Sequence, residues 1–273
     1  MNLILNGHEV GTVAYLSGGQ PVSITTEDSI YPKAADIRRI TALEVEPFVV
    51  EVGLLRPVMG WIDSMLSRQH ASRTVELRQG RDGQGLSRKA FECFLIEVGF
   101  PPLERRTAAD AYLKLKLQPT RTETRRTNVP RLNSPPMVPL SGHSFRFTID
   151  GALEGNEAQR VEGFTIKVGA KRHYVNDSRF SAIEPMKLTM PDFTLHLPST
   201  QAKRLQAWFD ADAEADGTTA TKERKGRLEL FARDGARAMT LELADLGIVS
   251  LAGMKGASAT VGIGCGKVSM GSQ

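Results

Sequence analysis

The chain has 273 residues, of which 41% are hydrophobic, 24% charged and 6% aromatic. This composition excludes a disordered tail, and the length accommodates one large domain or two domains of roughly 130 residues each. Lys and Arg number 35 against 31 Asp and Glu, a net charge of only +4, and because the two signs are interspersed, the charge argues against a strongly cationic nucleic-acid-binding surface.

The first half of the chain, residues 1–125, has the pattern of a β-domain interrupted by one helix. Asn6-Gly7 and Asp82-Gly83 are dipeptides that tight hairpin turns favour. After Pro57, apolar residues recur at helical spacing and include Trp61, which we expect to be a core anchor. Alternating apolar residues predict strands near residues 3–5, 47–52, 75–77, 91–96 and 112–117.

A stretch rich in Pro and Arg follows and shows no periodicity, so residues 126–141 are predicted to be a linker. Its arginines could form a nucleic-acid-binding arm, but neither interleaved aromatic residues nor a helical face accompanies them. Residues 142–273 again have a β pattern with one amphipathic helix, in which Trp208 is the second expected core anchor. Strands are predicted near residues 145–149, 192–197, 228–230, 239–243 and 260–265.

The two halves repeat the same elements in the same order, at an offset of about 145–152 residues. Phe48 and Phe193 open matching strands, and Trp61 and Trp208, the only two tryptophans, occupy matching helices. Arg-Asp-Gly recurs at 81–83 and 233–235 after a strand in each half, and Asp234-Gly235, like Asp82-Gly83, predicts a tight hairpin turn. We therefore predict a mainly β (α+β) protein with two tandem sandwich or barrel domains, each with one amphipathic helix packed on its sheet.

A search for chemistry predicts no catalytic, cofactor-binding or metal-binding residues. The five histidines do not have the spacing of a compact metal motif, and the glycines at 262–266 lack the residues of a phosphate-binding loop. No apolar run approaches the ~20 residues that span a bilayer, and the chain becomes polar at Asn6, too early for a signal peptide. We expect a soluble, non-enzymatic protein made in the cytoplasm.

Four segments of the second half follow one another in a recognisable order: Phe145–Gly151, Arg160–Lys167, Leu205–Asp210 and Arg224–Leu230. Through the order of these segments, roughly residues 142–270 resemble the tail tube proteins of contractile phages and contractile injection systems. The first half, about residues 1–125, looks like a more diverged copy, which residues 48–52, Trp61 and the turn at 81–83 support.

The resemblance implies self-assembly into a ring in which the sheets of neighbouring domains join around a lumen. A tube subunit resembles one copy, so a duplicated chain could be the tube subunit or a hub or initiator at its end. Three chains would supply six domains, giving threefold symmetry with a pseudo-sixfold ring. The partners implied are sheath, baseplate or spike proteins of a virion or tail-like particle, with nucleic acid only as lumen cargo.

Two sets of residues are candidates for assembly. The hairpin after Gly151 is polar for its length, and its candidate contacts are Glu154, Asn156, Glu157, Gln159 and Arg160. Lys114 and Lys116 alternate with leucines and are candidates for the lumen, although an outer solvent face fits the same alternation. Stacking of the two domains in successive layers is the alternative to their alternation in one ring. A different class of function is a tandem β-sandwich module that binds a protein or glycan.

Overall fold

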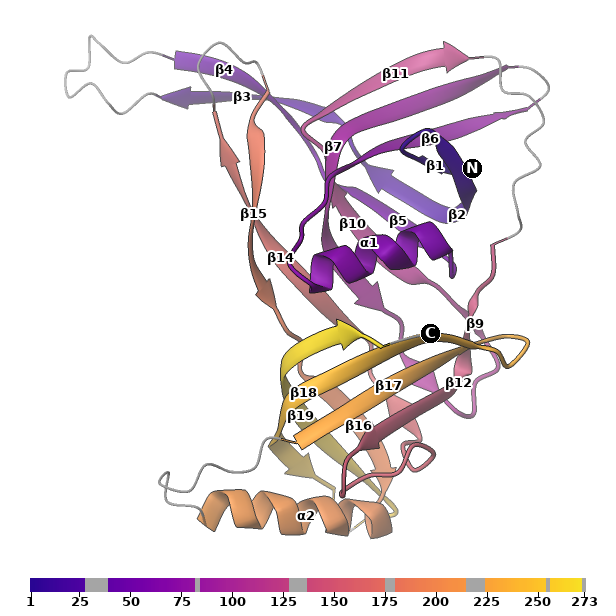
Figure 1. Cartoon of the computed structure of the whole chain (residues 1–273), viewed down its shortest axis with the longest axis vertical. Helices are drawn as coiled ribbons and strands as arrows, with labels where there is room; N and C mark the ends of the chain where they lie inside the picture. The colour runs from indigo at the N-terminus through magenta and orange to yellow at the C-terminus, as the bar shows by residue number, and fades with distance from the viewer. Residues whose placement is uncertain are drawn as a thin grey trace.

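The computed structural model describes residues 1–27, 39–81, 84–127, 137–174, 180–214, 224–253 and 256–271. Of these residues, 65% lie in strands, and two helices accompany them. The strands form a closed barrel and a curled half-barrel that follow one another along the long axis of the molecule (Figure 1). The expected mainly β class is confirmed.

The barrel is closed because its last strand pairs with the strands on both sides of it. Leu3, Val50 and Leu115 point inward and are at most 1% exposed. Asn6 and Gly7 both have positive φ angles and form the predicted turn of the first hairpin. The six strands are β1 (Asn2–Leu5), β2 (His8–Gly18), β5 (Phe48–Val52), β6 (Arg73–Arg81), β7 (Gln84–Phe100) and β10 (Leu113–Gln118).

The second sheet has eight strands and stays open. Its strands, in spatial order, are β8 (Leu103–Glu104), β13 (Arg160–Val161), β16 (Phe193–Pro198), β19 (Ser258–Met270), β18 (Arg237–Ala252), β17 (Arg224–Ala232), β12 (Leu140–Ile149) and β9 (Asp110–Ala111). Asp234-Gly235 forms the predicted turn between β17 and β18. The turn at Asp82-Gly83 lies outside the described residues.

Strands cross between the halves in both directions. The hairpin of β14 (Phe164–His173) and β15 (Ala182–Thr189) leaves the second half and extends the sheet of the barrel, whereas β8 and β9 extend the second sheet. The predicted division into 1–125, 126–141 and 142–273 stays a prediction. At the ends of the predicted linker, residues 126–127 belong to β11 (Arg121–Thr127) and residues 140–141 to β12, and residues 128–136 lie outside the described residues.

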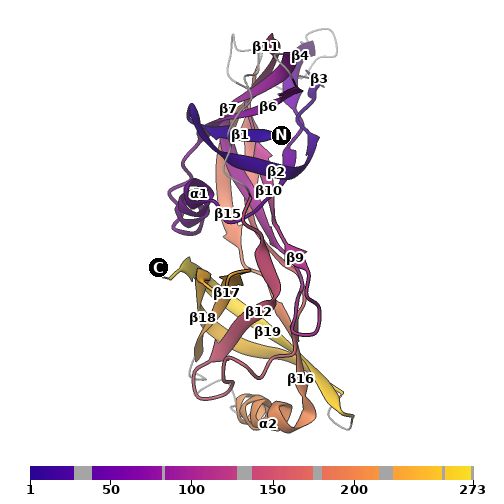
Figure 2. The same cartoon turned by 90° about the vertical axis from the view of Figure 1, so that its right-hand side faces the viewer.

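A two-stranded ribbon projects beyond the barrel, at the end of the molecule farthest from the second sheet (Figures 1 and 2). It consists of β3 (Pro21–Glu27) and β4 (Arg39–Val45), which among the described strands pair only with each other; one isolated bridge joins Leu43 of β4 to Phe180. We call this pair the ribbon. Its tip, residues 28–38, lies outside the described residues.

Each helix covers apolar surface with the stripe that the sequence predicted. Helix α1 (Arg56–Leu66) has Pro57 in its first turn and lies between the barrel and the second sheet, against β7 and β19 (Figure 1). Helix α2 (Ser199–Glu214) covers the far end of the second sheet. Trp61 on α1 is 2% exposed and Trp208 on α2 is 5% exposed. Both belong to one hydrophobic core that extends through both halves.

Replacing Gly19 by alanine should destabilise the barrel strongly. Gly19 has a φ angle of +74°, and a Cβ atom at this position would lie 2.0 Å from Cε1 of Phe48, which is fully buried. The left-handed backbone costs an L-residue about 1–2 kcal/mol, and overpacking a core adds about 1–3 kcal/mol. We expect urea denaturation to show a loss of about 2–5 kcal/mol in the free energy of unfolding.

Gly7→Ala is the matched control, because Gly7 has a φ angle of +86° but open space around its Cβ position. It should lose only the backbone contribution of about 1–2 kcal/mol. Equal losses in the two variants would contradict the packing of Phe48 against Gly19.

Candidate assembly site

The sheet formed by β2, β5, β10, β7, β14 and β15 has one buried face. Val50, Leu115, Val98 and Ile166 lie opposite one another in one row across four strands, and none is more than 1% exposed. Their neighbours along each strand point to the opposite face, which we call the polar face. Its two rows are Tyr15, Glu51, Lys114, Gly99 and Thr165, and Ser17, Val49, Lys116, Glu97, Lys167 and Thr189.

The lumen candidates Lys114 and Lys116 lie in the middle of the polar face. The leucines that alternate with them in β10 are at most 1% exposed. On the same face, Nζ of Lys167 lies 3.9 Å from Oε2 of Glu97, so charges of opposite sign face each other between the two halves. The orientation of the two lysines agrees with the alternation, and their assignment to a lumen stays a prediction.

The two halves meet where β14 pairs with the end of β7, and we call this pairing the inner junction. Thr165 lies opposite Gly99, and Lys167 opposite Glu97. On the buried side, the rings of Phe100 and Phe164 stack with centroids 4.5 Å apart, and Phe193 meets Phe164 edge-on at 4.7 Å. Backbone pairing, aromatic packing and a charge pair therefore hold the second half against the first.

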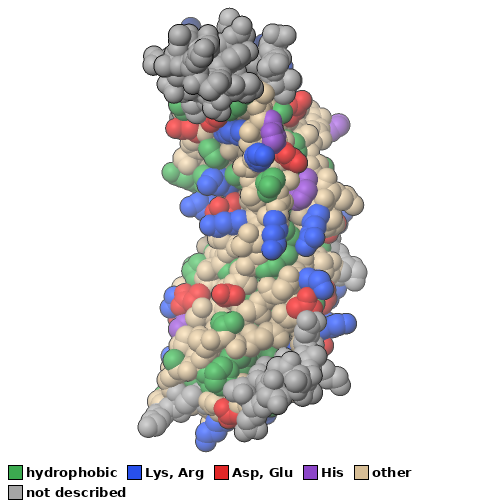
Figure 3. Space-filling view, turned by 90° about the vertical axis from the view of Figure 1, so that its left-hand side faces the viewer, with side chains coloured by type: hydrophobic (Ala, Val, Ile, Leu, Met, Phe, Trp, Pro, Cys, Tyr) green, Lys and Arg blue, Asp and Glu red, His purple; other side chains and the backbone are tan. Residues whose placement is uncertain are grey.

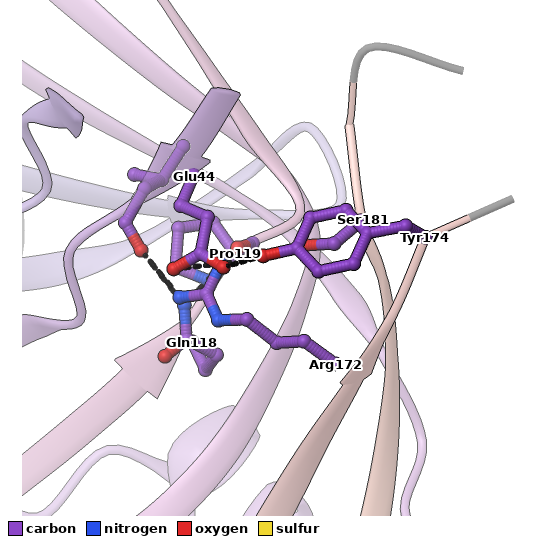
Figure 4. Close-up of polar contacts among 7 residues, drawn as sticks. Glu44, Gln118, Pro119, Arg172, Tyr174 and Ser181 are labelled. Atoms are coloured by element: carbon purple, nitrogen blue, oxygen red, sulfur yellow. Dashed lines mark hydrogen bonds and ion pairs between the residues drawn. The ribbon is translucent and has the colours of Figure 1, made fainter. Parts of the chain in front are cut away.

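A second contact fixes the far end of the hairpin against the base of the ribbon (Figure 4). One Nη of Arg172 donates to the carbonyl of Val45 at 2.9 Å, and the other lies 3.4 Å from Oε2 of Glu44. Tyr174 donates its hydroxyl to Glu44, and this hydrogen bond raises the pKa of Tyr174. Gln118 also donates to the carbonyl of Val45, at 3.0 Å. The hairpin and the ribbon are thus tied together where both leave the barrel.

A polar network lies on the second sheet. Nε2 of His196 is 2.8 Å from Oε1 of Glu162, and Nδ1 of His196 is 3.4 Å from Oγ1 of Thr260. The hydrogen bond with His196, together with Arg160, holds the pKa of Glu162 below its usual value. A hydroxyl, an imidazole and a carboxylate are the groups of a hydrolytic triad. Thr260, however, lies inside the paired strand β19 and not on a sharp turn, so we interpret the group as a surface network.

The predicted assembly residues Glu154–Arg160 lie before the projecting hairpin and not on it. This segment folds onto the second sheet, with Leu153 and Ala158 buried at its base. Glu157 pairs with Arg204 of α2 at 3.2 Å, and Arg160 pairs with β8 and β16. Glu154, Asn156 and Gln159 are exposed. The hairpin proper is β14–β15, and a role of Glu154–Arg160 in assembly stays a prediction.

A pocket lies between the two halves. It is bounded by Glu51 and Tyr112 from the barrel side and by Glu104, Asp110 and Arg160 from the second sheet, together with Pro101, Pro102, Thr107, Ala109, Ala111 and Gly142. The space-filling view of another side of the molecule has hydrophobic, basic and acidic side chains interspersed, without one continuous apolar patch (Figure 3). The pocket thus has a lining that combines apolar residues with charged side chains from both halves.

Within the described ranges, no three His, Cys, Asp or Glu side chains are arranged to hold a metal ion. Neither helix, in its described part, has the length and apolar character needed to cross a membrane. No protein-family model matches the sequence, and no curated protein matches it significantly.

Proposed function

We propose that the chain is a structural, non-enzymatic subunit of a phage-like tail tube, or of the hub that adjoins the tube. It assembles into a ring of three chains in which six domains surround a lumen. The observation that carries the proposal is the inner junction, where a hairpin of one half continues the sheet of the other half. Rings of β-domains need such junctions, because each domain must cover a strand edge of its neighbour.

The strand order of the two sheets supports a duplicated ring-forming domain. In the barrel the order β5-β10-β7-β6-β1 has α1 after its first strand, and in the second sheet the order β16-β19-β18-β17-β12 has α2 after its first strand. The ribbon also has the same strand register as the hairpin β14–β15. Val22 pairs with Glu44 in the ribbon, and the residues about 145 positions later, Lys167 and Thr189, pair in the hairpin. Two copies on one chain become neighbours in the ring because the chain holds them together.

The polar face provides the hydrated surface that a lumen requires. It continues from β2 across the inner junction to β15 without interruption by a buried row. In the proposed ring this face lines the lumen, with Lys114 and Lys116 on it. The ring is built in the cytoplasm, becomes part of a virion or tail-like particle, and meets sheath, baseplate or spike proteins on its other surfaces.

Mass measurement of the assembled protein tests the proposal. Because the two halves are not identical, alternating domains give threefold symmetry, and we expect native masses in multiples of three chains together with rings in negative-stain images. A ring of six chains would contradict the alternation and favour stacked layers. A protein that stays monomeric at all concentrations would contradict ring assembly.

The pocket between the halves favours a second candidate, a binding module for a protein or glycan. Its lining combines prolines with the carboxylates of Glu51 and Glu104 and the guanidinium of Arg160. A monomer that binds oligosaccharides in a glycan array, with binding lost in Arg160→Ala, would support this candidate over the ring.

A further inference from the structure

One strand edge of the second sheet is open where the equivalent edge of the barrel is occupied. Along one edge of β7, β6 pairs with the first part as far as Cys93, and β14 pairs with the last part, Glu97–Phe100. Along the same edge of β18, β17 pairs with the first part as far as Leu246. Beyond Leu246, no described strand pairs with that edge, which continues to Ala252. We call residues 247–252 the open edge.

The open edge is exposed and partly apolar. Val249 is 58% exposed, and its side chain lies over Gly262 and Gly264 of β19. Ser250 and Ala252 are also exposed. An unpaired strand edge of this kind invites pairing with another strand, so a partner that covers it stabilises the protein.

The ribbon also has a free edge, along β3, which pairs with no described strand other than β4. In its register it is the counterpart of the hairpin that fills the edge of β7, yet within its own chain it projects away from the second sheet (Figures 1 and 2). Val22 at its base is 38% exposed. The ribbon and the open edge lie in opposite ends of the molecule, so one chain cannot bring its own ribbon to its own open edge.

We infer that the ribbon of one chain pairs with the open edge of β18 in a second copy of the chain. The inference rests on the proposed function, since it describes the second type of junction in the ring. The inner junction sets the register: Lys167 faces Glu97 and Thr165 faces Gly99. The corresponding pairs between chains are Val22 with Ser250 and Gln20 with Ala252.

The counterpart residues on β18 follow from its pairing with β19. In the barrel, Lys114 and Lys116 of β10 face Gly99 and Glu97. In the second sheet, Thr260 and Gly262 of β19 face Ala252 and Ser250. On their other side, Thr260 and Gly262 pair with β16, just as Lys114 and Lys116 pair with β5, so the two pairs of residues occupy equivalent places in the two sheets. Ser250 therefore occupies the place of Glu97.

The junction between chains is weaker than the inner junction. Glu46 donates its N–H to the carbonyl of Gln20, so the backbone groups of Gln20 face β4 and those of Pro21 face the free side of the ribbon. Pro21 stands where the hairpin has Ile166 and has no N–H to donate. The pairing between chains consequently has one hydrogen bond fewer and lacks the stacked pair of Phe100 and Phe164. A proline at this place also limits uncontrolled pairing of the ribbon.

A disulfide between the two strands tests the inference in the full-length chain. Val22→Cys with Ser250→Cys, in a Cys265→Ser background, should form chain-to-chain disulfides on mild oxidation, because facing residues of antiparallel strands bring their Cβ atoms to about 4.5–5.5 Å. Non-reducing gels should show dimers and trimers. The matched control is Glu97→Cys with Lys167→Cys, which should link within one chain and leave its mass unchanged. Val22→Cys with Asp234→Cys, in the turn that precedes the other end of β18, should not link.

The outcomes separate the inference from the proposed function. Rings in multiples of three chains without the Val22–Ser250 link would overturn the inference and leave the proposed ring in place. Absence of any assembly would overturn the proposed function. Hydrogen exchange gives a second measurement: the amide of Leu251 should become roughly tenfold or more protected on assembly. Unchanged exchange of Leu251 in assembled rings would also overturn the inference.

Discussion

Replacing Trp61 by alanine should lower the free energy of unfolding by about 3–5 kcal/mol, the range for removal of a buried aromatic ring. Trp61 is 2% exposed, and its Nε1 donates to the carbonyl of Ala71 at 2.9 Å. The guanidinium of Arg73 lies 5.6 Å from the ring centroid. Because α1 contacts both β7 and β19, the cavity would weaken the barrel and its contact with the second sheet together. Urea denaturation followed by circular dichroism measures the loss.

Trp61→Phe is the control for the polar contribution. It keeps most of the packing and loses the hydrogen bond, so a loss of about 0.5–1.5 kcal/mol is expected. Trp208→Ala tests the same arrangement in the second half, where the ring is 5% exposed and lies 4.6 Å beneath the guanidinium of Arg224. A loss below about 1 kcal/mol for either alanine variant would contradict the role of that tryptophan as a core anchor.

Local features of the fold could be predicted because they depend on short-range patterns. Alternation in β10 placed its leucines inward and Lys114 and Lys116 outward, and helical spacing identified the buried stripe around Trp61. Asn6-Gly7 and Asp234-Gly235 predicted their hairpins because few other residues accept the backbone angles of these turns.

The exchange of strands between the halves could not be predicted. Phe164, Ile166 and Val168 alternate in β14, and alternation fixes which face of a strand is buried but not which strand lies at its edge. The polar residues between Glu154 and Arg160 predicted an assembly hairpin after Gly151, whereas the buried Leu153 and Ala158 anchor that segment on the second sheet. Arg172 donates a hydrogen bond to the carbonyl of Val45, 127 positions away, and a local sequence pattern cannot predict a contact at that separation.

Only part of the candidate site could be predicted from the sequence. The polarity of one sheet face follows from alternation, but its continuity across the two halves depends on the inner junction. The open edge of β18 follows only from comparing the two sheets, because residues 247–252 are a mainly apolar run that does not indicate whether another strand covers its edge.

Replacing Phe164 by alanine should open the inner junction. The ring is 6% exposed, stacks on Phe100 and meets Phe193 edge-on, so its removal costs about 3–5 kcal/mol. The hairpin β14–β15 then depends on four residues of backbone pairing with β7 and on the contacts of Arg172. We expect amide exchange to rise roughly 100-fold in β14, β15 and Glu97–Phe100. The amides of β1 and β6, which lie within the closed part of the barrel, should change much less.

Phe231→Ala is the matched control, since Phe231 is half-buried on β17 and contacts Arg146 rather than the junction. It should leave exchange in the hairpin unchanged. The decisive observation is whether Phe164→Ala accelerates exchange in the hairpin alone. If the hairpin were as stable as the strands of the barrel, it would unfold only together with those strands. Equal acceleration of exchange in β1, β6 and β14 would mean that the halves form one cooperative unit, and a ring-forming domain could not then be separated from its neighbour at this junction.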